Sequence, residues 1–525
     1  MNYKSWQHLY VGAIALLLLA LLWHHWQIIT AAVPLDLYEG TMVLITGIIA
    51  EGGNPYTREL QPQAADVYPP LYNILAALLS QLFGNHFQLH RALSAFFIIV
   101  ACATCTFATW RHCGAWRHAF AAGVLWYAAL LFYATPVSST NALGVALFLA
   151  CLVIPWCYRF SSASLVVALV CALLSFYTKQ YFILSMAILC LYLFLYVSMR
   201  RALLLGLGFS VALLTSLMLV HASSPYYLDN TLFAPAAAIN VLQDWSILFM
   251  QLGFYLRIHL GLLLLLALVA IPALHQRGLR GLLPKLAPAG TRWSGPLLRQ
   301  SADLFWFSLF WSSMVIVFWL GRNPGNYMTY LFQLMSPFLL IAGLSAISRA
   351  QVRLWIMVPL LLLNFYQSWA ILHKDFSVDM ENWYRIEALI DASDEVLATQ
   401  MLVVAQLERG KPVFQDGHTS YFPQAFTKPD WMRKDKPEEQ VEAIWEDYLT
   451  LMYRKIERRE FNYILVSPWE MRGIFLRNPP PFEEVDGKIF LSRHYCKAET
   501  LPLSMTNRHG AGTWNIQVWQ RKPCG

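Results

Sequence analysis

The chain of 525 residues is 57% hydrophobic and 13% charged, with a formal net charge of +7. Soluble domains carry about 25% charged residues, so this composition excludes an ordinary soluble globular protein. The charge is unevenly divided: residues 1–373 hold 18 Lys and Arg against 8 Asp and Glu, whereas residues 374–525 hold 20 against 23. The basic excess therefore belongs to the apolar part, and this distribution argues against a nucleic-acid partner.

Long apolar runs begin near the N-terminus and continue to about residue 373. A helix needs about 20 apolar residues to cross ~30 Å of hydrocarbon. We therefore expect a polytopic α-helical membrane protein, whose first helix is retained because no small-residue cleavage site follows it. The sequence predicts about eleven spans, at 9–30, 91–110, 116–134, 140–158, 163–178, 180–198, 202–221, 249–273, 302–320, 327–346 and 353–373.

Basic residues predict how the spans are oriented. With the N-terminus in the cytoplasm, thirteen Lys and Arg of residues 1–373 fall on the cytoplasmic side and five on the outer side, as the positive-inside rule requires. The same threading places seven of the eight acidic residues of this part on the outer side. The outer face is thus expected to collect both carboxylates and a few isolated cations.

The first outer loop, residues 31–90, contains the most informative acidic residues. In "VPLDLYEG" Asp36 and Glu39 directly follow the first span. A carboxylate held near a reacting carbon can act as a general base, and residues three apart share one face of a helix. The alternative is that both acids only cap or solubilise a helix start. A later run in this loop, 68–84, is too short to span, so we expect a juxtamembrane helix there.

Cations at the outer ends of the spans are the next candidates. A charged side chain within a span costs at least ~2.5–3.5 kcal/mol, so it marks either a functional site or a paired structural charge. Fixed cations suit the developing charge of a phosphate leaving group. Snorkelling to the membrane surface is the alternative explanation. The candidates are Lys179, Arg257 and Arg322.

Residues 374–525 are predicted to form a soluble α/β domain on the outer side. The apolar residues between 441 and 456 follow a helical rhythm, and "NYILVSP", "KIFLSR" and "WNIQVWQ" are typical of strands. Cys496 and Cys524 are the two cysteines of this part and could pair in an oxidising compartment. It has no Gly-rich phosphate loop, metal-spaced His/Cys set or nucleophile elbow.

Several pieces of the sequence together resemble the GT-C superfamily of membrane glycosyltransferases, in the branch that holds aminoarabinose transferases and protein O-mannosyltransferases. The matching pieces are the first-loop acid, "EGGNPY" (51–56), "YPPLYNILAALLSQLFG" (68–84), "RALS" (91–94), "TKQ" (178–180) and "GNYMTYLFQLMSPF" (325–338). The resemblance covers the first 110 residues well and about 370 loosely.

The resemblance implies an inverting glycosyltransferase with a polyprenyl-phosphate-linked sugar donor. A first-loop carboxylate would activate the acceptor hydroxyl, and basic side chains would hold the phosphate. The catalytic candidates, in order, are Glu39, Asp36 and Asp66, and the candidates for binding the substrate or its phosphate are Lys179, Arg257, Arg322, Tyr68 and Tyr327.

The sequence departs from the family pattern at three positions. Tyr38 takes the place of the Asp in an Asp-Glu pair, Val67 stands where some members have an acid, and Asn141 stands where an Asp is expected. The first departure leaves the base open between Glu39 and Asp36.

The resemblance also bears on cofactors, partners and location. We expect no required cofactor and assign no metal site, because Lys and Arg side chains facing a monophosphate make a metal cation unnecessary. Use of a divalent cation stays an alternative. The partners are a lipid-linked donor and an unidentified glycan, lipid or protein acceptor. The expected location is a bacterial inner membrane, with residues 374–525 in the periplasm.

Two alternative functions stay open. One is a transporter or flippase of lipid-linked sugars, which predicts polar groups in the middle of the spans. The other is an envelope polysaccharide assembly protein.

Overall fold

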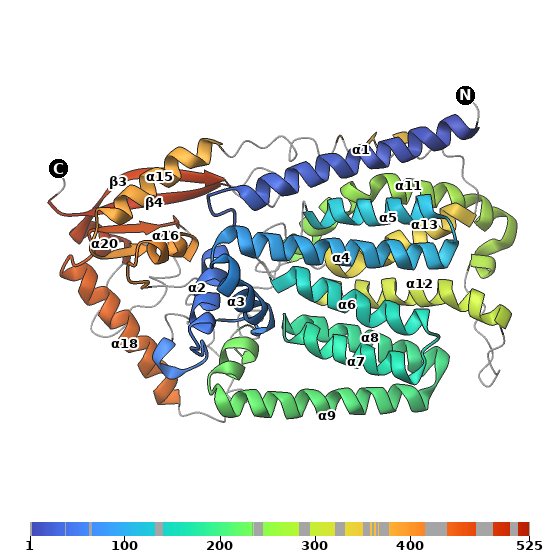
Figure 1. Cartoon of the computed structure of the whole chain (residues 1–525), viewed down its shortest axis with the longest axis horizontal. Coiled ribbons are helices and arrows are strands. Elements are labelled where there is room, and N and C mark those ends of the chain that lie inside the picture. The colour runs from blue at the N-terminus through green and yellow to red at the C-terminus, as the bar shows by residue number, and fades with distance from the viewer. Residues whose placement is uncertain are drawn as a thin grey trace.

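A computed structural model gives the structure of the chain, and Figure 1 shows its arrangement. It describes residues 3–36, 38–61, 66–131, 140–233, 235, 245–282, 295–320, 331–349, 358–359, 362–363, 366, 377–398, 400–414, 438–468, 487–504 and 513–523.

Five described helices are long and apolar enough to cross a membrane. They coincide with the predicted spans 9–30, 91–110, 140–158, 180–198 and 202–221, because length and apolar composition can both be read locally from the sequence. Four of them are α1 (Tyr3–Thr30), α4 (Phe87–Cys113), α6 (Thr140–Cys157) and α9 (Met199–Ser223). The fifth is a continuous run of three elements, η3 (Gln180–Ile183), α8 (Leu184–Tyr192) and the π-helical turn η4 (Leu193–Val197).

Further apolar helices pack beside these in one bundle (Figure 1). They overlap five more predicted spans, whereas the predicted span 353–373 lies almost wholly outside the described residues, so the total of eleven stays a prediction. These helices are α5 (Trp116–Ala129), α7 (Ser162–Phe176), α11 (Trp245–Leu282), α12 (Gly295–Leu320) and α13 (Ser336–Arg349), the last preceded by the π-helical turn η7 (Leu331–Met335).

The segment between α1 and α4 lies across one end of the bundle, between the bundle and the C-terminal sheet (Figure 1). We call this the loop end. The segment contains α2 (Glu39–Ala50), η1 (Arg58–Leu60) and α3 (Leu71–Phe83). One face of α3 is buried, while Leu78, Leu82 and Phe83 are 65%, 78% and 64% exposed. A short helix with an exposed apolar face has the properties of a helix that lies at a membrane surface.

The described residues after 376 form a four-stranded sheet with helices around it. The strand order is β1-β2-β4-β3, in which β1 runs parallel to β2 and the other neighbours are antiparallel. Its strands are β1 (Val396–Ala398), β2 (Tyr463–Val466), β3 (Tyr495–Ser504) and β4 (Thr513–Arg521). Its helices are α15 (Ser377–Asp391), η8 (Gln400–Leu402), α16 (Val403–Glu408), α18 (Glu438–Glu457) and α20 (Gly487–His494).

The strand prediction for "KIFLSR" is wrong, because these residues lie in helix α20. A short apolar run does not separate a strand from a helix by its pattern alone. The phenyl ring of Phe490 stacks on Tyr453 of α18 at 5.1 Å between centroids. This packing against a neighbouring helix is invisible in the local sequence. The runs "NYILVSP" and "WNIQVWQ" do contain strands β2 and β4.

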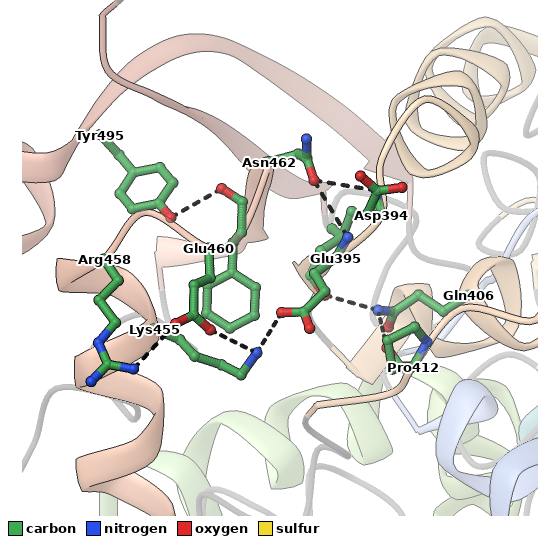
Figure 2. Close-up of polar contacts among 11 residues, drawn as sticks. Asp394, Glu395, Gln406, Pro412, Lys455, Arg458, Glu460, Asn462 and Tyr495 are labelled. Carbon is green, nitrogen blue, oxygen red and sulfur yellow. Dashed lines mark hydrogen bonds and ion pairs between the residues drawn. The ribbon is translucent and has the colours of Figure 1, made fainter.

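A polar network ties α18 to the starts of β1 and β2 (Figure 2). The Lys455 ammonium lies 2.5 Å from a carboxylate oxygen of Glu395 and 3.0 Å from one of Glu460. The side-chain oxygen of Asn462 accepts hydrogen bonds from the backbone N–H groups of Asp394 and Glu395. Lys455, Glu395 and Glu460 are thus paired with one another, and these contacts hold α18 against the strands.

Cys496 is disulfide-bonded, as the predicted pairing requires, while Cys524 lies outside the described residues.

The C-terminal part rests directly on the loop end of the bundle. Val404 of α16 is buried with Val43 of α2 and Phe87 of α4 in a small apolar cluster. Helix α16 accordingly lies beside α2 in Figure 1. The position of α2 is thus set from both sides, by the bundle and by the C-terminal part.

Substituting Val404→Asp should lower the free energy of unfolding by about 2–4 kcal/mol, because the new carboxylate would be buried among apolar groups without a partner. Thermal unfolding of the full chain in detergent measures this. The matched control is Leu407→Asp on the same helix, whose side chain is 36% exposed. Equal effects of the two substitutions would contradict the packing described.

Candidate active site

A buried ion pair fixes the start of α2. The Arg91 Nε donates to Glu39 Oε1 at 2.8 Å, and its Nη2 donates to Glu39 Oε2 at 2.7 Å, with both side chains fully buried. Glu39 Oε2 also accepts the backbone N–H of Leu35 at 2.7 Å. Because Glu39 is the first residue of α2, its negative charge also suits the positive end of the helix dipole.

The same guanidinium also holds the chain between α1 and α2. Its Nη1 donates to the carbonyl oxygens of Ile28 and Ala31 at 3.1 and 2.5 Å, and its Nη2 to that of Val33 at 2.7 Å. A paired charge with all its donors engaged is the form in which a buried charge is tolerated. Both oxygens of Glu39 are therefore occupied in holding the loop, which favours a structural role for this first-ranked candidate.

Asp36 and Lys179 lie within electrostatic range of each other at the loop end of the bundle. Asp36 is partly exposed, and its Oδ1 accepts the backbone N–H of Tyr38 at 3.0 Å. The Lys179 Nζ lies 4.6 Å from the ring centroid of Tyr68 and 5.6 Å from that of Tyr181. Burial lowers the pKa of Lys179 from 10.5 to about 8, and the negative charge of Asp36 opposes this shift. The ammonium thus packs against two aromatic rings, within the electric field of the Asp36 carboxylate.

Two sets of hydrogen bonds bring Lys179 to Tyr68. The side-chain amide of Gln180 donates to the backbone carbonyl of Val67 at 2.8 Å and also to that of Thr231. The backbone N–H of Leu71 donates to the carbonyl of Tyr177 at 3.0 Å. The turn between α7 and η3 is thereby joined to the segment around "YPPLY". This explains how residues far apart in the sequence form one wall.

Asp66 lies behind this wall and is fully buried. Its Oδ1 accepts the backbone N–H of Tyr68 at 3.0 Å, and its Oδ2 accepts the side-chain amide of Asn73 at 3.1 Å. Burial raises the pKa of Asp66 from 3.8 to about 7, although these hydrogen bonds lower it in part. The carboxyl group is placed to fix the backbone at Tyr68, since its two oxygens face the protein's own donors.

Comparison with solved structures identifies this architecture. A crystal structure of ArnT from Cupriavidus metallidurans bound to undecaprenyl phosphate matches with a TM-score of 0.52 at 10% sequence identity, covering 99% of this chain and 98% of that one. ArnT is a GT-C glycosyltransferase. The chain has the GT-C fold. The apo state of the same ArnT matches with a TM-score of 0.49 at 11% identity over 97% of each chain. No protein family description and no curated protein sequence matches the chain.

In this GT-C fold the predicted site residues divide into four groups. Lys179 packs on Tyr68 within the electric field of Asp36, while Glu39 and Asp66 are engaged in structural contacts. The Arg257 side chain is exposed on α11 and is not brought to this position in the structure. The remaining two candidates, Arg322 and Tyr327, lie outside the described residues.

Sequence reasoning missed the partners that build the site. Arg91, Asn73 and Gln180 stand in stretches that carry the family resemblance, but the sequence alone assigns none of them a role in the site. All three are polar residues within largely apolar runs, which is the signal that marks them.

Two other features of the GT-C fold do not point to a second reactive site. Within the described ranges, no three His, Cys, Asp or Glu side chains are grouped so as to hold a metal ion. An apolar cavity of about 680 Å³ lies between α1, α4 and α5, with Leu18, Phe107 and Trp110 in its lining. Its lining is almost entirely apolar, so it offers no charged side chain for acid–base chemistry or for binding a phosphate.

Substituting Arg91→Met should destabilise the protein by about 3–5 kcal/mol, because it leaves the buried Glu39 carboxylate without its cation. The double variant Glu39→Leu with Arg91→Met should recover part of this loss, since neither buried charge then remains. Thermal unfolding in detergent measures both. A double variant that is less stable than Arg91→Met alone would show that the ion pair is not the source of the effect.

Proposed function

We propose that the protein is an inverting glycosyltransferase that moves a sugar from a polyprenyl-phosphate donor to an acceptor hydroxyl at the outer face of the membrane. The observation that carries the proposal is the Lys179 ammonium, which packs on the Tyr68 ring at the loop end of the bundle within the electric field of the partly exposed Asp36 carboxylate. The GT-C fold supports it, since the ArnT of matching fold binds undecaprenyl phosphate. The excess of cations at the opposite helix ends supports the outer placement of the loop end.

Asp36 is the proposed general base. Its partly exposed carboxylate would take the proton of the acceptor hydroxyl, while the hydroxyl oxygen bonds to the anomeric carbon and the bond from that carbon to the phosphate oxygen breaks. Attack from the face opposite the phosphate inverts the anomeric configuration. Glu39 is less suited to this role because both of its oxygens already bind Arg91.

Lys179 is the proposed stabiliser of the leaving group. Polyprenyl phosphate leaves with added negative charge on the oxygen that was bonded to the sugar. A fixed ammonium in a partly buried position stabilises this charge more than water does, because little reorganisation is needed. No metal or other cofactor is required for this step, since Lys179 supplies the positive charge.

Asp36→Asn should lower kcat by about 10²–10⁴-fold, the usual contribution of a general base, without a change in thermal stability. Transfer by the purified protein from pooled polyprenyl-phosphate sugars measures the rate. The matched control is Glu51→Gln, an exposed acid of the same loop, which should keep the wild-type rate. Wild-type kinetics in Asp36→Asn would overturn Asp36 as the base.

Transfer should decline as the pH rises above about 8, because the pKa of Lys179 lies near 8 and only its charged form stabilises the leaving phosphate. In Lys179→Arg the decline should disappear, since the guanidinium keeps its charge throughout the measured pH range. Rate profiles between about pH 6 and pH 10 measure this. An identical decline in both proteins would assign the titration to another group.

A further inference from the structure

Three neutral polar side chains from three different elements meet at the Tyr181 hydroxyl. They are Asn141 at the start of α6, Tyr181 in η3 and Gln333 in η7. The Tyr181 hydroxyl contacts the side-chain oxygen of Gln333, and it lies 3.3 Å from that of Asn141. Gln333 is 0% exposed and Asn141 8% exposed. The Tyr181 ring links this cluster to the Lys179 ammonium, which lies 5.6 Å from the ring centroid.

A glycine in α6 allows α6 and η3 to lie in close contact. Gly144, one turn after Asn141, faces η3, and a Cβ atom at this glycine would lie 2.1 Å from the ring of Phe182. Any larger residue would push η3 away from α6. The close contact therefore keeps Tyr181 within reach of Asn141.

One end of the Gln333 amide has no partner. Its oxygen accepts from Tyr181, but its nitrogen, with two N–H donors, makes no hydrogen bond in the described structure although it is buried. Leaving such donors unsatisfied destabilises a folded protein. A buried polar group of this kind calls for a specific explanation, and its place beside the proposed donor phosphate site points to a ligand oxygen.

The chemistry of the cluster indicates which part of the donor it meets. A phosphate needs cations, and Lys179 supplies one. Amide and phenol groups carry no charge but offer both donors and acceptors, which match the hydroxyl groups of a sugar. An ammonium or carboxylate on the sugar would find no opposite charge among these three side chains.

We propose that Gln333, with Tyr181 and Asn141, forms the subsite for the sugar ring of the donor, and that this sugar is uncharged. The Gln333 amide nitrogen donates to a sugar oxygen, while Lys179 holds the adjoining phosphate. This inference rests on the proposed transferase function and adds to it the residue that recognises the sugar and the chemical class of that sugar.

The test measures the affinity of the purified full chain for three probes. They are undecaprenyl phosphate, undecaprenyl phosphate carrying a neutral hexose, and undecaprenyl phosphate carrying an amino sugar. Gln333→Leu should bind the neutral glycosylated probe about 10- to 100-fold more weakly than wild type and bind undecaprenyl phosphate unchanged. The wild-type protein should prefer the neutral sugar to the amino sugar by about tenfold or more.

The matched control is Ser345→Ala. Ser345 lies about 18 Å further along the same helical run, is also buried, and its hydroxyl also has no partner in the described structure. The control should bind all three probes like wild type. Thermal unfolding of Gln333→Leu should match wild type or lie slightly above it, because an unsatisfied buried donor is removed.

The outcomes separate the two proposals. If the wild-type protein binds undecaprenyl phosphate and the neutral donor but Gln333→Leu binds both equally well, the sugar subsite is wrong and the transferase proposal stands. Equal weakening for both probes would also overturn it, since Gln333 would then contact the phosphate. A preference for the amino sugar would overturn the uncharged class. If the wild-type protein binds no probe and transfers no sugar, the proposed function and the subsite both fail.

Discussion

The ion pair between Arg91 and Glu39 is the interaction on which the arrangement of the loop end depends. It lies out of contact with solvent, and such a pair is stable only when its geometry is good and its remaining donors are satisfied. Arg91 meets both conditions, because it binds both carboxylate oxygens of Glu39 and three backbone carbonyls near the end of α1. The start of α2 is therefore fixed to α1 and α4. Since the C-terminal part rests on α2 through Val404, the same pair also positions the sheet.

Three carboxylates of one short segment have three different environments. Glu39 is locked by a cation, Asp66 is buried among neutral donors with a pKa raised to about 7, and Asp36 is partly exposed within the field of Lys179. Separate environments allow similar side chains to take separate roles. The two buried acids hold the backbone that carries Asp36 and Tyr68. Asp36, the partly exposed acid of the three, is the one that we propose as the general base.

Much of the fold could be predicted because a membrane-spanning helix is defined by the length and apolar composition of one continuous stretch of sequence. The predicted span 91–110 lies within α4 and the predicted span 202–221 within α9, since a long apolar run has few alternatives in a bilayer. The prediction of a strand at "KIFLSR" failed because helix α20 is chosen by the packing of Phe490 on Tyr453. In the site, Lys179 could be proposed from its charge at the outer end of a span, whereas Tyr68 could be proposed only through the family resemblance. Their mutual contact depends on the hydrogen bonds of Gln180 and Leu71 to elements distant in the sequence.

The sequence by itself determined that this is a helical membrane protein with an acid-rich loop after its first span, because composition and run length decide those properties. Only the tertiary structure decided which acid is paired and which faces Lys179. The pairing of Glu39 with Arg91 requires α4 to lie against α2, and no local pattern carries that information. The role of a carboxylate depends on its burial and on its partners. Both are set by residues that the chain brings together from far apart.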